Sequence, residues 1–192
     1  AEKVRISGGG RANFTNRDLD PRQPHKHFLG DNPHFCRSAL SRYTPTDFTG
    51  LLQRHGVPFH EKHKGQLFCD RSAQDLIDVL LRECDAGGVT RWQPCGVHGV
   101  AFSDADPTTR YTLQTDRGPV SAHALVVATG GLSIPKIGAT DFGFRLARQF
   151  DLNVITPRPA LVPLTFDPQA WAPFADLSGL ALPVRIETGE KK

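Results

Sequence analysis

The stretch YTLQTDRGPVSAHALVVATGG, Tyr111–Gly131, determines the fold class that the sequence predicts. Apolar and polar residues alternate on both sides of the turn residues 116–118, which indicates two antiparallel strands. Residues 97–100 supply an earlier strand, so we expect a three-stranded antiparallel meander. The apolar run 124–128 then stops at two glycines. Such a run is typical of a strand that is buried on both faces, as in a parallel α/β sheet.

The residues that end this run point to a ligand. Open α/β sheets bind ligands at the carboxyl ends of their strands, and glycine there lets a cofactor approach the backbone closely. A tight turn after a core strand would use the same residues, Thr129, Gly130 and Gly131. However, a meander followed directly by Ala-Thr-Gly is the layout of flavoproteins with two dinucleotide domains. The combination favours a flavin site.

The remaining elements follow from apolar periodicity and from turn residues. Ser72 and Asp75 resemble a capping box, and Gly56 stands where a helix would end. A turn at 62–65 separates two short strands, and alternation at 180–186 predicts a last one. One helix is expected to begin near Pro33. Three further helices are expected at residues 46–55, 72–86 and 141–150.

A second glycine motif stands near the start, in RISGGGRANFTN, Arg5–Asn16. Backbone N–H groups of consecutive glycines can turn towards an anion, and Arg11 would strengthen the hold. A flexible turn would explain three glycines equally well. The sequence contains neither Gly-x-Gly-x-x-Gly nor Gly-Lys-Ser/Thr, so neither dinucleotide fingerprint nor P-loop supports the first interpretation.

Composition excludes several classes of protein. The chain has 192 residues, 39% of them hydrophobic, and a net charge of +3 whose carriers are scattered. We therefore expect a cytoplasmic globular protein with a small-molecule substrate, no nucleic-acid partner and no membrane span. The cysteines stand far apart without a Cys-x-x-Cys pair, which argues against zinc and fits a reducing compartment; they are Cys36, Cys69, Cys84 and Cys95.

Four segments, taken in order, resemble a known family. The sequence is similar to a bacterial family of FAD-dependent, NAD(P)-linked oxidoreductases that includes aminoacetone oxidase and flavoproteins acting on bile-acid intermediates. The segments are Arg5–Asn16, Gly65–Leu81, Ala124–Arg148 and Pro159–Leu164. The resemblance implies an α/β, glutathione-reductase-like FAD domain at 1–165. It also implies that 166–192 are a linker and the first strand of a β-rich insertion domain.

The resemblance also implies site residues. The catalytic step would be hydride transfer between FAD and a small organic substrate or NAD(P)H, with the cofactor supplying the electron chemistry. No catalytic residue is assigned. Val97 would approach the adenine of FAD. The implied cofactor-binding residues are Gly8, Gly9, Gly10, Arg11, Asn13, Val97, Thr129, Gly130 and Gly131.

Several positions depart from the family pattern. Ala12 stands where the family usually has Cys, and Gln66 and Cys69 replace an Arg and a Pro. Asp141 replaces a Gly. The family's Gly-x-Gly-x-x-Gly strand and its flavin-closing C-terminal segment do not occur in the sequence, so we expect an internal fragment that binds FAD weakly or not at all alone. The alternative is a cofactor-free, catalytically idle module whose glycine loop binds an anion or a partner chain.

Overall fold

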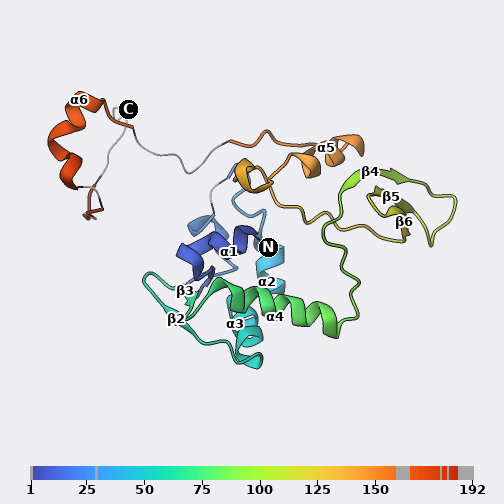
Figure 1. Cartoon of the computed structure of the whole chain (residues 1–192), viewed down its shortest axis with the longest axis horizontal. Coiled ribbons are helices and arrows are strands. Elements are labelled where there is room, and N and C mark those ends of the chain that lie inside the picture. The colour runs from blue at the N-terminus through green and yellow to red at the C-terminus, as the bar shows by residue number, and fades with distance from the viewer. Residues whose placement is uncertain (1, 29, 159–164, 178, 181, 186–192) are drawn as a thin grey trace.

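The computed structural model describes residues 2–28, 30–158, 165–177, 179–180 and 182–185 (Figure 1). Helices and two small sheets alternate along the chain. The strands of the first sheet lie between residues 13 and 69, and those of the second lie between residues 97 and 122. Each has three strands, and every strand pair in the described residues is antiparallel.

The first sheet has the order β1-β3-β2. The predicted pair of strands around the turn at 62–65 is confirmed as β2 (Phe59–Glu61) and β3 (Gln66–Cys69). Strand β1 (Asn13–Asn16), which pairs with β3 on the other side, was not predicted from the sequence. Gly65 closes the turn at a φ of +71°, and a Cβ there would lie 2.5 Å from Oδ1 of Asn16. Only glycine therefore fits between β1 and this turn.

Two helices that cover this sheet agree with the sequence prediction. They are α3 (Pro45–Arg54) and α4 (Ala73–Ala86). The capping box, however, lies at α3, where the Thr44 side chain and Asp47 satisfy each other's backbone N–H groups. At α4, Ser72 accepts a hydrogen bond from the Gln74 backbone, and Asp75 binds the Arg71 side chain instead of completing a box.

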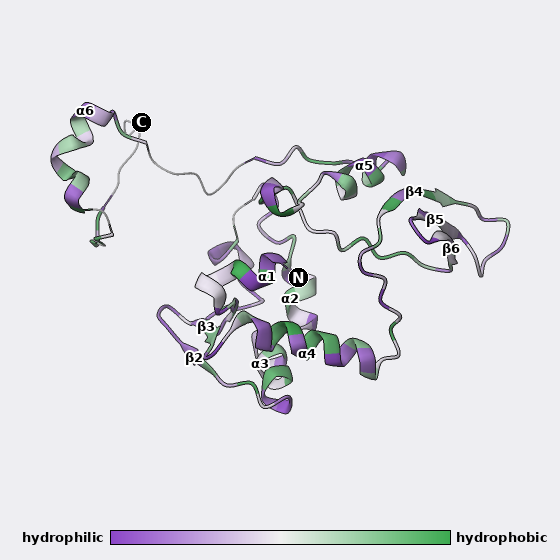
Figure 2. Ribbon diagram, viewed as in Figure 1, coloured by the Kyte–Doolittle hydropathy of each residue, from purple (hydrophilic) through white to green (hydrophobic). Residues whose placement is uncertain are grey.

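The main hydrophobic core lies between this sheet and the two helices. Phe14 of β1 contacts Phe48 of α3 and Phe59 of β2 edge to face, with ring centroids 5.7 and 5.5 Å apart. Figure 2 shows hydrophobic and hydrophilic stretches alternating along α4, as expected for a helix with one buried side. The buried members are Ala12, Leu51, Leu52, Val57, Cys69, Ala73, Leu76 and Val79.

The second sheet is the predicted meander. It consists of β4 (Val97–Phe102), β5 (Tyr111–Thr115) and β6 (Gly118–Ala122), and Leu113 of β5 pairs with Val100 and Val120. The predicted helix beside it is confirmed as α5 (Phe142–Gln149).

Helix α5 is attached to one end of this meander. Its Gln149 side chain donates a 2.6 Å hydrogen bond to the Val100 carbonyl. Directly after the helix, the Phe150 ring makes edge contacts with Phe102 and Tyr111. These contacts hold α5 against the apolar face of the second sheet.

The remaining elements are short. They are α1 (Glu2–Ile6), α2 (Arg37–Arg42) and α6 (Pro168–Trp171), and four 3₁₀ turns, η1 (Ser7–Gly10), η2 (Pro24–Lys26), η3 (Pro135–Ile137) and η4 (Ala172–Leu177). The helix expected from Pro33 begins only at Arg37, which leaves Phe35 outside it and 85% exposed. No helix within the described ranges combines the length and the apolar character that a membrane span requires.

The predicted buried strand at 124–128 is wrong for this structure. The segment belongs to no strand, and Val126 is 84% exposed. A strand buried on both faces needs neighbouring strands that accept its hydrogen bonds. In the described part of the chain, both sheets are complete without this segment, and no parallel pair exists.

The C-terminal predictions have a similar outcome. Residues 182–185 of the strand expected at 180–186 are in no strand, and Ile186 lies outside the described residues. The proline-rich passage 156–164 falls mostly outside them too. The α/β class with an antiparallel meander therefore stands, whereas the described residues do not contain the expected parallel sheet.

Truncating the core tests this packing. Leu52 is fully buried, so Leu52→Ala should lower the free energy of unfolding by about 2–5 kcal/mol, measured by urea denaturation. Leu80→Ala on α4 is the matched control because Leu80 is 42% exposed, and it should cost less than about 1 kcal/mol. Equal losses for the two variants would contradict the assignment of the core.

The capping box predicts a pH dependence. Hydrogen bonds from Thr44 lower the pKa of the Asp47 carboxyl. The folded state therefore favours the carboxylate, and its stabilising contribution is present above the unfolded pKa and disappears as the pH falls through the folded one. The stability difference between wild type and Asp47→Ala should be largest near neutrality and shrink below about pH 4. Asp31→Ala, which removes no helix cap, should not show this pattern in the same denaturation series.

Candidate functional site

The glycine run of the sequence forms η1, directly after α1. All three glycines have positive φ angles, +57° at Gly8, +67° at Gly9 and +82° at Gly10. A Cβ on Gly8 would lie 2.7 Å from the Asn13 backbone nitrogen and 2.8 Å from the Phe68 ring, whereas Gly9 and Gly10 face open space. Gly8 is therefore required by the close approach to the first sheet, and the other two leave backbone available to a ligand.

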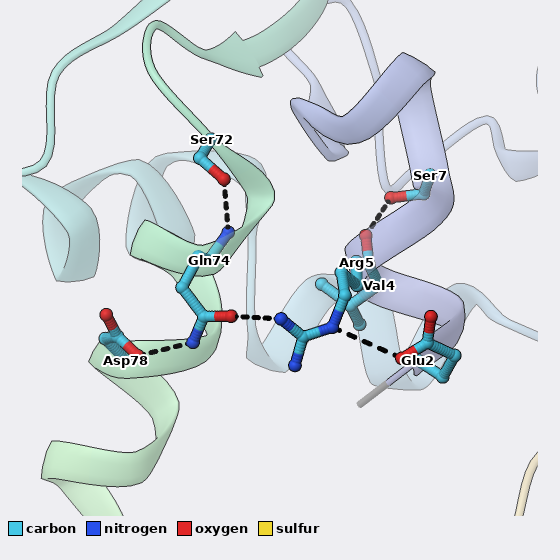
Figure 3. Close-up of polar contacts among 7 residues, drawn as sticks. All are labelled: Glu2, Val4, Arg5, Ser7, Ser72, Gln74 and Asp78. Atoms are coloured by element: carbon cyan, nitrogen blue, oxygen red, sulfur yellow. Dashed lines mark hydrogen bonds and ion pairs between the residues drawn. The ribbon is translucent and has the colours of Figure 1, made fainter.

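Hydrogen bonds on both sides hold this loop in place. The Ala12 backbone nitrogen donates to the Ser7 carbonyl at 3.0 Å, and the Cys69 nitrogen donates to the Arg11 carbonyl at 2.9 Å. The Ser7 hydroxyl donates to the Val4 carbonyl at 2.8 Å (Figure 3). Ala12 itself is buried at a φ of +50°. The loop is thus a hydrogen-bonded turn anchored on β3.

A chain of polar side chains connects α1 with α4. Arg5 donates to Oε1 of Gln74 at 2.6 Å, and Gln74 donates to Asp78 at 2.6 Å. The other side of the same guanidinium pairs with Glu2 at 3.2 Å (Figure 3). Because these contacts fix α1 on α4, they also fix where the glycine loop begins.

The second glycine motif lies beside α1. A cavity of about 260 Å³ is lined by Thr129, Gly130 and Gly131 together with Glu2 and Lys3 of α1. The Lys3 ammonium donates a 2.8 Å hydrogen bond to the hydroxyl of Ser133. Gly130 has a φ of +74°, and a Cβ at this position would meet no atom within 4 Å, so its backbone is open to the cavity. A cation beside exposed glycine backbone suits an anionic group.

The structure places most of the predicted site residues near the two ends of α1. Gly8–Gly10, Arg11 and Asn13 follow the end of the helix, and Thr129–Gly131 share a cavity with its start. Val97 lies elsewhere, in a cavity of about 510 Å³ on the meander that Trp92 and Leu113 also line. Thus the described cavities join Thr129–Gly131 to α1 but do not join either motif to Val97.

Sequence reasoning missed Lys3. Its role depends on a contact across the chain, with Ser133, that no local pattern reveals. The one signal in the sequence was a lysine five residues before the glycine run. A polar residue near a ligand-binding glycine loop is a candidate even when it belongs to no motif.

The titratable groups do not form a catalytic cluster in the described residues. Burial raises the pKa of the Cys69 thiol, which favours its neutral, unreactive form. Near Val97, the hydrogen bond from the Gly96 backbone and a second from His98 lower the pKa of Asp116. No group of three or more His, Cys, Asp or Glu side chains in the described part could hold a metal ion. What these residues can do is bind and orient a ligand.

Two alanine variants separate the roles of the glycines. Gly9→Ala adds only the strain of a positive φ, about 1–2 kcal/mol. Gly8→Ala adds the same strain and also a collision with Asn13 and Phe68, so it should cost roughly 1–3 kcal/mol more. The measurement is urea denaturation of both variants. If Gly9→Ala were as destabilising as Gly8→Ala, the described packing of the loop on the first sheet would be wrong.

Comparison with known proteins places these features in a family. Residues 1–180 match the family described as "HI0933-like protein Rossmann domain". The chain is 44% identical over 181 residues to a ribosomal RNA dihydrouridine synthase of Escherichia coli (strain K12), covering 94% of this chain and 43% of that protein. A protein of the same name from Haemophilus influenzae is 43% identical over 184 residues, covering 96% of this chain and 45% of the relative.

A more distant relative agrees with the bile-acid flavoproteins that the sequence resembles. It is a 3-dehydro-bile acid delta(4,6)-reductase of Clostridium scindens, 24% identical over 187 residues, with 96% of this chain and 42% of the relative covered. The chain therefore spans less than half the length of each of these relatives. With a match over nearly its whole length, the chain belongs to the HI0933-like family of Rossmann-domain proteins.

Proposed function

We propose that this chain is part of a flavin-dependent oxidoreductase that reduces a carbon–carbon double bond. The family match and the names of the relatives support the reaction class. Dihydrouridine is uridine with a saturated ring double bond, and the name of the third relative also describes a reduction. The two reactions named for the relatives therefore share one kind of chemistry, the addition of a hydride and a proton to a double bond.

The observation that carries the proposal is the open glycine backbone on both sides of α1. Gly9, Gly10 and Gly130 all have positive φ angles with free space where a Cβ would stand, as do several glycines in turns elsewhere in the described residues. What distinguishes these three is their position at the two ends of α1. Such positions admit the close approach of a dinucleotide to the main chain. Lys3 adds a positive charge beside one of them. The residues present therefore fit part of an FAD molecule.

In this proposal each group of residues has a binding role. Gly8–Gly10, Arg11 and Asn13 would hold one part of FAD, and Thr129–Gly131 with Lys3 would hold another. Val97 would approach the adenine, in a glutathione-reductase-like arrangement with a domain boundary at 165. FAD, when bound, would supply the hydride, and the role of these residues would be to hold the cofactor.

The proposed substrate is a uridine in ribosomal RNA, which departs from the expectation, drawn from the scattered charges, of a small-molecule substrate and no nucleic-acid partner. The two relatives at 43–44% identity are both named ribosomal RNA dihydrouridine synthase, and nearly the whole of this chain aligns with each of them. A small organic molecule is the second candidate because the 24% relative is named for one and because the charges of the sequence are scattered. FAD and NAD(P)H would serve either substrate.

The experiment combines cofactor binding with product analysis. Because the chain alone is expected to bind FAD weakly or not at all, a Gly-x-Gly-x-x-Gly strand is joined to its N-terminus for this experiment. The purified protein is titrated with FAD and is then incubated with NADPH and, in separate reactions, with unmodified ribosomal RNA or a small cyclic enone. We expect saturable FAD binding and RNA nucleosides that gain two hydrogens, detected by mass spectrometry. Lys3→Glu places a negative charge in the cavity and should weaken FAD binding about tenfold or more. Lys64→Glu is the matched control because it makes the same charge change in the β2–β3 turn.

Each part of this experiment has an outcome that would contradict the proposal it tests. Equal FAD affinity for Lys3→Glu and Lys64→Glu would remove Lys3 from the cofactor site. Absence of saturable FAD binding would refute the flavin proposal and favour the cofactor-free module. FAD binding with reduction of a small enone, but not of RNA, would select the second substrate class.

A further inference from the structure

A further cavity lies between the segment before α2 and α5. It measures about 500 Å³, and its wall includes Phe28 and Phe35 from the first segment and Phe144 from α5. Amide side chains of Asn32 and Asn153 stand in the same wall, with Ile155 beside them. The cavity shares no lining residue with the one at Thr129–Gly131. None of the predicted site residues lines it.

The aromatic groups of this cavity are unusually accessible. Phe35 is 85% exposed and Phe28 46% exposed, although both are large apolar side chains. An aromatic ring left open beside a cavity costs hydration free energy, so a ligand that covers it is favoured. Flat ligands satisfy such rings best because they stack on the ring face.

The polar groups of the wall add directional contacts. The Asn32 carbonyl oxygen accepts from the His34 backbone at 3.1 Å, which orients the amide and leaves its NH₂ group as a donor. The Asn153 amide can both donate and accept. Bases that are splayed out of a single strand are recognised by this combination of aromatic stacking and hydrogen bonds to their edges.

The charge of the same segment is complementary to phosphate. Residues 21–43 contain four Lys and Arg residues, of which Arg22 is paired with Asp20. None of the four lines the cavity, whereas the one acidic residue of the segment, Asp31, does. No ion pair within the described ranges engages Lys26, Arg37 or Arg42. A purely apolar protein partner would cover the rings but would leave these cations without counter-charges. A polyanion with flat bases would cover the rings and also supply counter-charges for the cations.

Helix α5 relates this cavity to the candidate flavin site. Phe144 lines the cavity, and the neighbouring Gly143 lies against Thr129, where a Cβ would be 3.3 Å from the threonine hydroxyl oxygen. A single turn of α5 thus contacts both places.

We infer that the cavity between Phe35 and Phe144 binds one unstacked base of single-stranded RNA, while Lys26, Arg37 and Arg42 bind the phosphates around it. The choice of RNA rests on the proposed function. The aromatic wall rests on the residues that line the cavity, and the phosphate contacts rest on cations of the same segment that do not line it. Exposed aromatic rings combined with a basic groove are the usual means by which proteins bind single strands.

The test uses the purified protein and a fluorescein-labelled oligouridylate of about 12 nucleotides, a length within the usual range of such sites. Binding is followed by fluorescence anisotropy. Phe35→Ala should weaken binding about 5- to 100-fold through the loss of stacking, and Phe35→Trp should restore it. The fold should be unaffected because Phe35 is 85% exposed. Phe174→Ala, at a phenylalanine 48% exposed on η4, is the matched control and should bind like wild type.

An abasic oligomer with the same phosphates separates stacking from charge. Wild type and Phe35→Ala should bind it equally, because no base remains to stack. Lys26→Ala combined with Arg37→Ala should weaken both oligomers and reduce the slope of log affinity against log salt by about 1.4, at ~0.7 for each phosphate that is no longer neutralised. If Phe35→Ala binds oligouridylate like wild type, or if Phe174→Ala loses as much affinity, the inference is overturned.

Two further readouts keep this inference separate from the proposed function. FAD affinity should be the same in wild type and Phe35→Ala; a loss would make the cavity part of the cofactor site and overturn the assignment to RNA. RNA binding that depends on Phe35 without any dihydrouridine formation would support the base site and contradict the proposed reaction. Dihydrouridine formation that is unchanged by Phe35→Ala, at RNA concentrations below saturation, would contradict the base site alone.

Discussion

The close approach of Gly8 to the first sheet is the constraint on which the rest of the candidate site depends. At this point the main chain of η1 passes so near the Asn13 nitrogen and the Phe68 ring that no side chain fits between them. The sharp turn sets the exit of α1, and the Ala12–Ser7 and Cys69–Arg11 hydrogen bonds keep it there. At Gly9 and Gly10, by contrast, a Cβ would meet no atom within 4 Å.

The contacts of α1 itself contribute less to this arrangement. The pairs that involve Arg5 are exposed, and exposed ion pairs and hydrogen bonds contribute little net stability. Their effect is orientation, since a five-residue helix has too few internal hydrogen bonds to be stable alone. Burial around Leu52 and Val79 supplies the stability, and the polar chain from Arg5 to Asp78 directs α1 towards Ser133.

How much the sequence could predict follows from how local each signal is. Helices α3, α4 and α5 and the meander were predictable because each carries its own apolar period and its own turn residues. β1 was missed because its four residues, Asn-Phe-Thr-Asn, become a strand only through pairing with β3. The run 124–128 was assigned wrongly for the opposite reason. Its apolar composition indicates a buried strand, but strand formation requires a hydrogen-bonding neighbour, and the described residues provide none.

The candidate sites show the same distinction. Glycine runs are visible in a sequence, so Gly8–Gly10 and Thr129–Gly131 could be named, whereas Lys3 and Phe35 gain their roles from cavities formed by distant segments. Gly143 lies between the two cavities, which have no lining residue in common. Because it lacks a side chain, the first turn of α5 packs against Thr129 while the next residue, Phe144, enters the wall of the other cavity. An alanine at 143 would place its Cβ 3.3 Å from the Thr129 hydroxyl oxygen, so that Thr129 or α5 would have to shift by a few tenths of an ångström. Gly143 thus lets the first turn of α5 lie close to Thr129, although it contacts no ligand in either proposal.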